Sequence, residues 1–123
     1  MPLTKALLIL SFLSSLFGAT AQDNTAIKML SSTQFKQAIS KDSVQLLDVR
    51  TVPEFLNGHI KGAVNIDFLK PKLFIEGVHQ LDKEMPVYLY CRSGNRSNKA
   101  AKQLISLGFK EIYDLKGGYL GWN

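Results

Sequence analysis

Cys91 is the residue best suited to covalent chemistry in this chain of 123 residues. It follows the apolar run Pro86 to Tyr90 and is followed by a polar loop made of Arg92, Ser93, Gly94, Asn95 and Arg96. A tight loop that enters a helix points backbone N–H groups inward, and with the helix N-terminus these groups form an anion-binding concavity. Such surroundings stabilise a thiolate, the nucleophilic form of cysteine. We therefore expect Cys91 to be a nucleophile cradled by residues 92–96.

The charges that follow the cysteine are all positive, since residues 92–110 contain no acidic side chain. The planar guanidinium of arginine is well suited to binding oxyanions. We expect Arg92 to face an anionic substrate and Arg96 to close the loop, with both within reach of the substrate. Lys99 and Lys102 are expected to lie on the solvated face of the helix.

A second set of candidate residues, Asp48, Arg50 and Glu54, lies near the end of an earlier apolar run. Because ligands of parallel sheets bind where the carboxyl ends of the strands meet, we expect Asp48 to face the Cys91 loop. Arg50 and Glu54 have a spacing that allows an ion pair to pin this segment. We expect all three to support the site rather than to react. His59 is interpreted as a hydrogen-bonded turn residue in preference to a general base.

The elements that must position these residues alternate between strands and helices. Apolar runs predict strands over 44–49, 63–66, 86–91 and 111–115. Helices are predicted from the capping-box pair Ser31 and Gln34 to about Ser40, over a short turn at 54–57, in part of 67–81, and over 96–107. This alternation predicts one α/β domain with a parallel sheet over 31–123, preceded by a loose lead-in at 22–30.

The amino-acid composition bounds the class of protein. Fifteen basic and ten acidic residues give a net charge of +5 without a run of like charge, so we expect no nucleic-acid partner. One cysteine and two histidines exclude an intramolecular disulfide and a cysteine-based zinc site, so we expect neither metal nor cofactor. The mild positive excess makes anionic substrates easier to attract, and solubility alone explains the same net charge equally well.

The N-terminal segment has the layout of a secretory signal peptide. Lys5 precedes an apolar stretch that reaches about Gly18, and Ala19, Thr20 and Ala21 then supply a cleavage site with small residues. The apolar stretch is shorter than the roughly 20 residues that span a bilayer. We therefore expect residues 1–21 to be removed, membrane contact only during export, and a periplasmic or secreted protein.

Three motifs together resemble the rhodanese-like sulfurtransferase family, most closely its small exported single-domain members. They are LLDVRTVPEFLNGHIKGAVNID at 46–67, CRSGNRS at 91–97 and GGYLGW at 117–122. The resemblance implies a three-layer fold in which helices flank a central parallel sheet. Many members continue beyond the position of Trp122, so we expect an open C-terminal edge or one completed by a partner.

The resemblance also implies a sulfur-transfer reaction. The thiolate of Cys91 would take the outer sulfur of a donor such as thiosulfate, and the resulting persulfide would pass it to cyanide or a thiol. Backbone N–H groups of residues 92–96 would hold the persulfide anion. The sequence leaves open a second reading, in which Cys91 carries a persulfide for a protein acceptor or acts in a binding module.

The length of the loop bears on a related class of enzymes. The resemblance extends to phosphatases on the same fold, which also hold a thiolate in a loop. Their loop is one residue longer, with arginine six positions after cysteine. Here that position is Ser97, and Arg96 lies five after Cys91. The shorter loop disfavours phosphatase and arsenate reductase activities and leaves both as weaker alternatives. A thioredoxin-like role would require a second cysteine.

Overall fold

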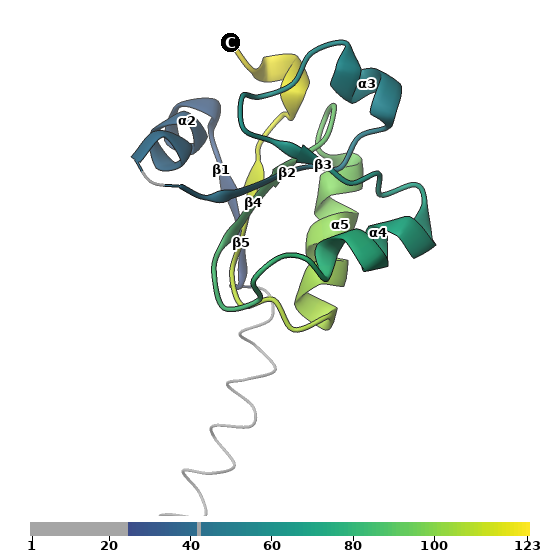
Figure 1. Ribbon diagram of the computed structural model, residues 1–123. Coiled ribbons are helices and arrows are strands. Elements are labelled where there is room, and N and C mark those ends of the chain that lie inside the picture. The colour runs from purple at the N-terminus through teal and green to yellow at the C-terminus, as the bar shows by residue number, and fades with distance from the viewer. Residues whose placement is uncertain (1–24, 42) are drawn as a thin grey trace, which may run out of the picture.

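A parallel sheet of five strands forms the centre of the computed structural model, which describes residues 25–41 and 43–123 (Figure 1). Its order is β1-β5-β4-β2-β3. The strands are β1 (Ile27–Leu30), β2 (Gln45–Asp48), β3 (Val64–Asn65), β4 (Val87–Tyr90) and β5 (Ile112–Leu115). Every pairing is parallel, so the carboxyl ends of all five strands lie at one edge.

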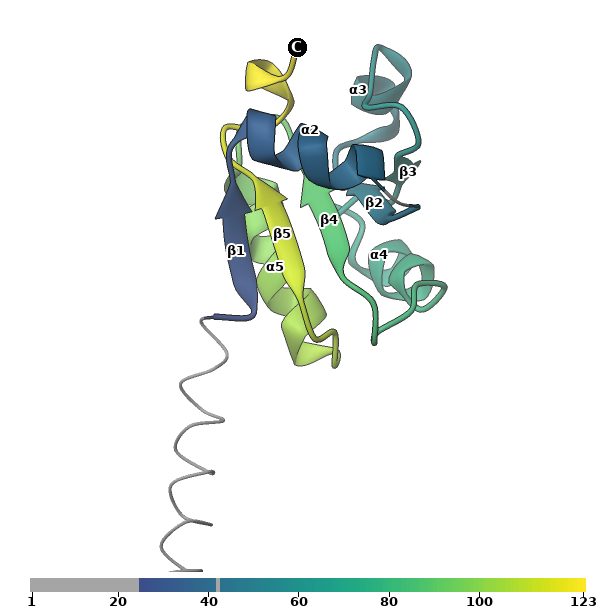
Figure 2. The ribbon, with the colours of Figure 1, turned by 90° about the vertical axis from the view of Figure 1, so that its left-hand side faces the viewer.

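Helices cover both faces of the sheet and complete three layers (Figure 2). One face carries α2 (Ser32–Lys41), and the other carries α4 (Pro71–Val78) and α5 (Asn95–Ser106). Two short elements, α3 (Val52–Leu56) and the 3-10 helix η1 (Tyr119–Gly121), lie at the carboxyl edge. The predicted α/β fold with a flanked parallel sheet is confirmed.

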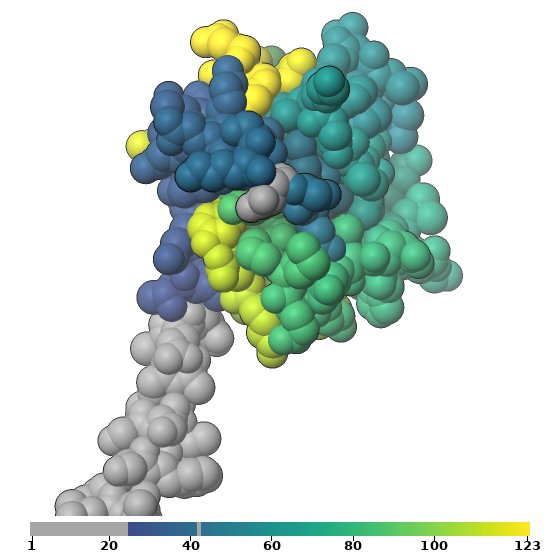
Figure 3. Space-filling model, turned by 60° about the vertical axis from the view of Figure 1, so that its left-hand side comes forward, coloured from purple at the N-terminus to yellow at the C-terminus, as the bar shows by residue number. Residues whose placement is uncertain are grey.

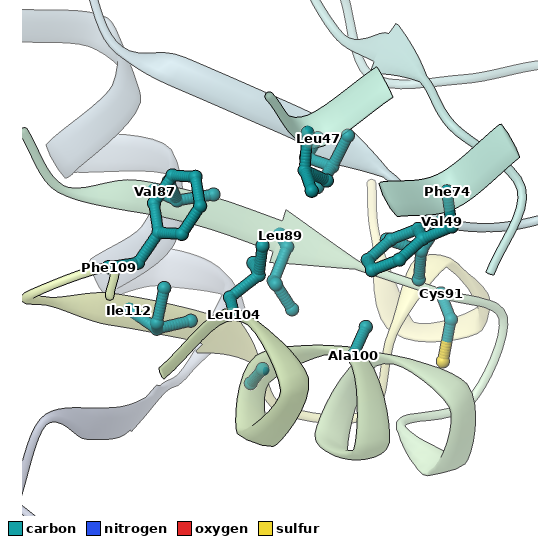
Figure 4. Close-up of a cluster of buried hydrophobic side chains, with 12 residues drawn as sticks. Leu47, Val49, Phe74, Val87, Leu89, Cys91, Ala100, Leu104, Phe109 and Ile112 are labelled. Atoms are coloured by element: carbon teal, nitrogen blue, oxygen red, sulfur yellow. The ribbon is translucent and has the colours of Figure 1, made fainter. Parts of the chain in front are cut away.

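Each face of the sheet carries its own hydrophobic cluster, because neighbouring residues of a strand point to opposite sides. The larger cluster, packed by α4 and α5, includes Leu89 and Cys91 (Figure 4). The smaller cluster, packed by α2, includes Phe35 and Tyr90. Figure 3 shows α2 in blue lying across its face of the molecule. Burial of both faces explains the near-continuous apolar run of β4.

The structure corrects one element and confirms another. Residues 27–30, which the sequence predicts to be part of a loose lead-in, form the edge strand β1 and pair with β5. The predicted capping box is present, since Ser31 N–H donates to Gln34 Oε1 and Gln34 N–H donates to Ser31 Oγ.

The expected signal peptide, residues 1–21, lies outside the described residues. In 25–41 and 43–123, none of the helices has the length and apolar character needed to cross a membrane.

Candidate active site

Cys91 lies directly after β4, at the carboxyl edge of the sheet. Its side chain is 1% exposed and belongs to the cluster on the α5 side. Figure 4 shows its sulfur at one end of this cluster, pointing toward α5. The strand therefore holds the sulfur at the position where open α/β sheets bind their ligands.

The loop after Cys91 turns back onto the sulfur, and of the backbone N–H groups expected to face it, that of Gly94 donates to it. Gly94 has a φ of +113°, in the region that L-amino acids with side chains rarely adopt. This conformation lets the Gly94 N–H donate to Cys91 Sγ at 3.0 Å. Ser97 Oγ lies 3.3 Å from the same sulfur, and α5 begins at Asn95, one residue earlier than predicted. The loop thus brings a backbone donor onto one buried sulfur, and the first turn of α5 brings a hydroxyl oxygen that accepts from it.

The loop is anchored to α3 by an ion pair between Arg96 and Glu54. The two guanidinium N–H groups donate to the two carboxylate oxygens at 2.7 and 2.9 Å. Glu54 also closes a capping box with Thr51 at the start of α3. The hydrogen bonds from Arg96 are the largest cause that lowers the pKa of Glu54 from 4.5 to about 2. The same pairing raises the pKa of Arg96.

This pairing corrects the expected ion pair between Arg50 and Glu54. Arg50 instead binds Asp48, with its Nε at 3.0 Å and one terminal nitrogen at 2.7 Å from the carboxylate oxygens. It also donates to the carbonyl of Gly58 at 2.7 Å. The pair is almost fully buried, so it satisfies two charges that would otherwise be costly inside the protein.

The expectation that Asp48 faces the Cys91 loop is wrong. Leu47 and Val49 belong to the cluster on the α5 side, so Asp48 between them points to the α2 side. Cys91 points to the α5 side for the same reason. Asp48 and Arg50 therefore support the carboxyl edge from the opposite face and do not approach the sulfur.

The C-terminal segment holds the other side of the loop, a role that the sequence predictions missed. Tyr119 N–H donates to the Cys91 carbonyl at 2.8 Å, and Leu120 N–H donates to the Arg92 carbonyl at 3.0 Å. Gly118 permits this approach, because a Cβ there would lie 2.5 Å from the Arg92 oxygen. The two successive glycines of the GGYLGW motif were the available signal for this close packing.

The outer part of the loop faces solvent. Arg92, Ser93 and Asn95 are exposed, whereas Arg96 is partly buried by its pairing with Glu54. Arg92 is thus the loop arginine whose side chain is open to solvent. Over 25–41 and 43–123, no group of three His, Cys, Asp or Glu side chains could hold a metal ion.

His59 has the structural role expected of a turn residue. Its side chain is exposed, and Nδ1 lies 2.9 Å from the Phe55 carbonyl oxygen. Its ring stacks on that of Phe55 with centroids 3.7 Å apart.

The Arg96–Glu54 pair makes the stability of the protein depend on acid pH. Because the pKa of Glu54 is about 2 in the folded protein, against an ordinary 4.5, its stabilisation is complete above 4.5 and is lost toward pH 2. Urea unfolding should show that the unfolding free energy falls more steeply between pH 4.5 and pH 2 in the wild type than in Glu54→Gln. Glu76→Gln, an exposed acid on α4, is the matched control and should behave as the wild type. If the unfolding free energies of the wild type and Glu54→Gln differed by the same amount at all pH values, the ion pair would not be the cause of the pH dependence.

The packing of Gly118 predicts different effects for two neighbouring alanine substitutions. Both glycines have positive φ, but a Cβ at Gly117 would meet no atom within 4 Å. Gly117→Ala should cost about 1–2 kcal/mol of unfolding free energy from backbone strain alone. Gly118→Ala should cost more and should also alter the reactivity of Cys91, because the loop must move away. If chemical denaturation showed equal losses of unfolding free energy in the two variants, the close approach of Gly118 to the Arg92 carbonyl would have no effect on stability.

Comparison with known proteins agrees with this geometry. Residues 31–123 match the model of the rhodanese-like domain family. Thiosulfate sulfurtransferase GlpE of Shewanella oneidensis is 36% identical over 99 residues, which are 80% of this chain and 95% of the relative. The putative sulfur carrier protein YrkF of Bacillus subtilis is 30% identical over 104 residues, or 84% of this chain and 55% of the relative.

Solved structures give the same result. The crystal structure of a rhodanese-like domain protein from Staphylococcus aureus superposes with a TM-score of 0.69 and 26% sequence identity. The match covers 78% of this chain and 91% of that chain. With its parallel sheet, its cysteine loop and a family match over nearly all of the described residues, this chain belongs to the rhodanese-like domain family.

Proposed function

We propose that this protein is a sulfurtransferase that receives a sulfane sulfur on Cys91 from a donor such as thiosulfate and transfers it to a thiophilic acceptor. The observation that carries the proposal is the 3.0 Å hydrogen bond from the Gly94 N–H to Cys91 Sγ, made at the carboxyl edge of the sheet. The relative from Shewanella oneidensis, named as a thiosulfate sulfurtransferase, supports it.

The first half-reaction forms the persulfide. The Cys91 thiolate attacks the outer sulfur of thiosulfate, a new S–S bond forms, and the bond from that sulfur to the sulfonate breaks. Sulfite leaves with the electron pair of the broken bond, and the negative charge remains on the terminal sulfur of the persulfide. A preorganised N–H group such as that of Gly94 stabilises this anion without reorganisation during the reaction.

The second half-reaction returns the enzyme to its starting state. A nucleophile such as cyanide or a thiolate attacks the terminal sulfur, and the S–S bond of the persulfide breaks. The electron pair of that bond goes to Cys91 Sγ, which becomes a thiolate again in the same cradle. No external oxidant or reductant is needed, because the sulfur carries its oxidation state from donor to acceptor.

The state of Arg96 favours sulfur transfer over phosphate-ester hydrolysis. A phosphate would need an arginine fork aimed at its oxygens. In this protein the guanidinium of Arg96 is bound by both carboxylate oxygens of Glu54, so it holds the loop in place. We keep the expectation that Arg96 closes the loop, but we no longer expect it to contact the substrate, because Glu54 binds its guanidinium. We assign contact with the sulfonate of the donor to Arg92, which is exposed at the mouth of the loop.

The role of Cys91 is tested by sulfur transfer from thiosulfate to cyanide. Cys91→Ser should abolish the transfer, because a serine cannot form a persulfide, while the unfolding midpoint stays close to that of the wild type. Phosphate-ester hydrolysis is measured on the same samples as the control for the competing reaction. Hydrolysis without sulfur transfer, or full transfer by Cys91→Ser, would contradict the proposed function.

The role of Arg92 is tested by the same assay at varied donor concentration. Arg92→Ala should raise KM for thiosulfate several-fold and change kcat less, because the lost interaction is with the sulfonate oxygens, which form and break no bond in the reaction. Lys99→Ala removes one positive charge from an exposed position on α5 and serves as the matched control. Equal changes in the two variants would show that only net charge matters and that Arg92 makes no specific contact.

A further inference from the structure

A buried carboxyl group that the proposed reaction does not use lies behind the cysteine loop. Asp114, on β5, is fully buried, and neither of its carboxyl oxygens has a hydrogen-bond partner among the described residues. Leaving such a group unpaired is costly, and the cost is largest when it is charged. This position therefore calls for an explanation beyond packing.

Asp114 points to the same side of the sheet as the reactive sulfur. Ile112, two residues earlier on β5, belongs to the cluster that contains Cys91, and side chains two apart in a strand share a face. Ser97 lies beside both groups. Its Oγ accepts from Cys91 Sγ at 3.3 Å, and its hydroxyl donates to the Gly94 carbonyl. Ser97 is also close enough to the Asp114 carboxyl to lower its pKa, although it makes no hydrogen bond to it.

The neighbouring elements bring no cation to Asp114. The strand β1 presents Met29, its register partner, and β4 presents Leu89 and then Cys91. The helix α5 presents the Ser97 hydroxyl. The guanidinium of Arg96, which interacts with Cys91, is bound to Glu54.

The last element, η1, carries one titratable side chain, and it points elsewhere. The ring of Tyr119 stacks on Tyr90, on the opposite face of the sheet. Burial without a cation raises the pKa of Asp114 from 3.8 to about 6, with the interaction from Ser97 acting in the opposite direction.

We propose that Asp114 is a positioning residue for the Cys91 anion, because it holds a proton while the sulfur is ionised and so leaves the Ser97 hydroxyl free to face the sulfur. A carboxylate would attract the Ser97 proton away from the sulfur. A protonated carboxyl can instead donate to Ser97 Oγ, and Ser97 can then donate its own proton toward the sulfur anion. The inference rests on the proposed function for its role in turnover.

The proton balance of this arrangement is closed within the site. In the structure the Cys91 thiol donates to Ser97 Oγ and the Ser97 hydroxyl donates to the Gly94 carbonyl. When the thiol ionises, the Ser97 hydroxyl turns from that carbonyl to Asp114, the thiol proton passes to Ser97 Oγ, and the Ser97 proton passes to an oxygen of Asp114. The sulfur gains the negative charge and Asp114 becomes neutral, so the buried region carries one negative charge before and after. Persulfide formation by thiosulfate exchanges one sulfur anion for another and leaves the proton on Asp114.

The first test measures the titration of Asp114 itself, by carbon NMR of protein labelled at the aspartate carboxyls and assigned by through-bond correlation. A negative charge on a nearby sulfur disfavours a second one, so the titration midpoint should lie about one pH unit or more higher in the reduced wild type than in Cys91→Ser. The same midpoint in both proteins would overturn the proposal. This readout does not depend on sulfur transfer.

The second test measures the rate of persulfide formation from thiosulfate against pH, relative to the maximum of each protein. The wild-type rate should fall on the alkaline side as Asp114 ionises, because Ser97 turns away and the dianionic donor meets a second negative charge. Asp114→Asn, whose amide stays neutral, should lack this fall. Glu111→Gln removes a carboxylate directly before β5 begins, at the end of the strand away from Asp114, and this variant should keep the alkaline fall in rate.

The outcomes of the two tests separate the two proposals. A persistent alkaline fall in Asp114→Asn would overturn the role of Asp114 while leaving sulfur transfer intact. Absence of any persulfide in the wild type would overturn the proposed function, and the NMR midpoint would still decide the protonation of Asp114.

Discussion

The hydrogen bond from the Gly94 N–H to the sulfur of Cys91 is the interaction on which the rest of the site depends. It requires the cysteine to stand at the end of a buried strand and the next turn to pass through a left-handed residue. A sulfur anion formed at this position, where Cys91 is 1% exposed, would receive little stabilisation from water, so its hydrogen-bond donors would have to come from the protein. The left-handed turn at Gly94, directly before α5, places such a donor on the sulfur.

Two remote segments keep this loop in shape. From one side, Glu54 on α3 binds Arg96 and prevents the helix start from moving away from the sheet edge. From the other side, the backbone after Gly118 binds the carbonyls of Cys91 and Arg92. Both contacts join residues that are far apart in the sequence, so the cradle exists only in the folded domain. The Asp48–Arg50 pair supports the same edge from the opposite face.

The sequence predicted those parts of the molecule whose cause is local. The apolar run before Cys91, the permissive Gly94 and the apolar stripe of α5 are each readable within a few residues, and all three were found. The strand β1 was missed, because four residues at a sheet edge become a strand only through pairing with β5, more than eighty residues later.

The errors at the site have a related origin. Spacing along the chain suggested a local pair between Arg50 and Glu54, whereas the fold offered each a better partner. Asp48 was expected at the loop because strand ends meet at one edge, but the alternation of side chains sends it to the other face. The apolar neighbours Leu47 and Val49 carried the information needed to avoid that error. The Thr51–Glu54 capping box also had a readable pattern in the sequence.

The acceptance of sulfur by Cys91 can be measured by the intact mass of the reduced protein before and after thiosulfate. We expect a gain of one sulfur atom, which is lost on addition of cyanide and is absent in Cys91→Ser. An unchanged mass in the wild type, under conditions in which Cys91 is shown to be reduced, would contradict the claim that this buried cysteine accepts sulfur from thiosulfate.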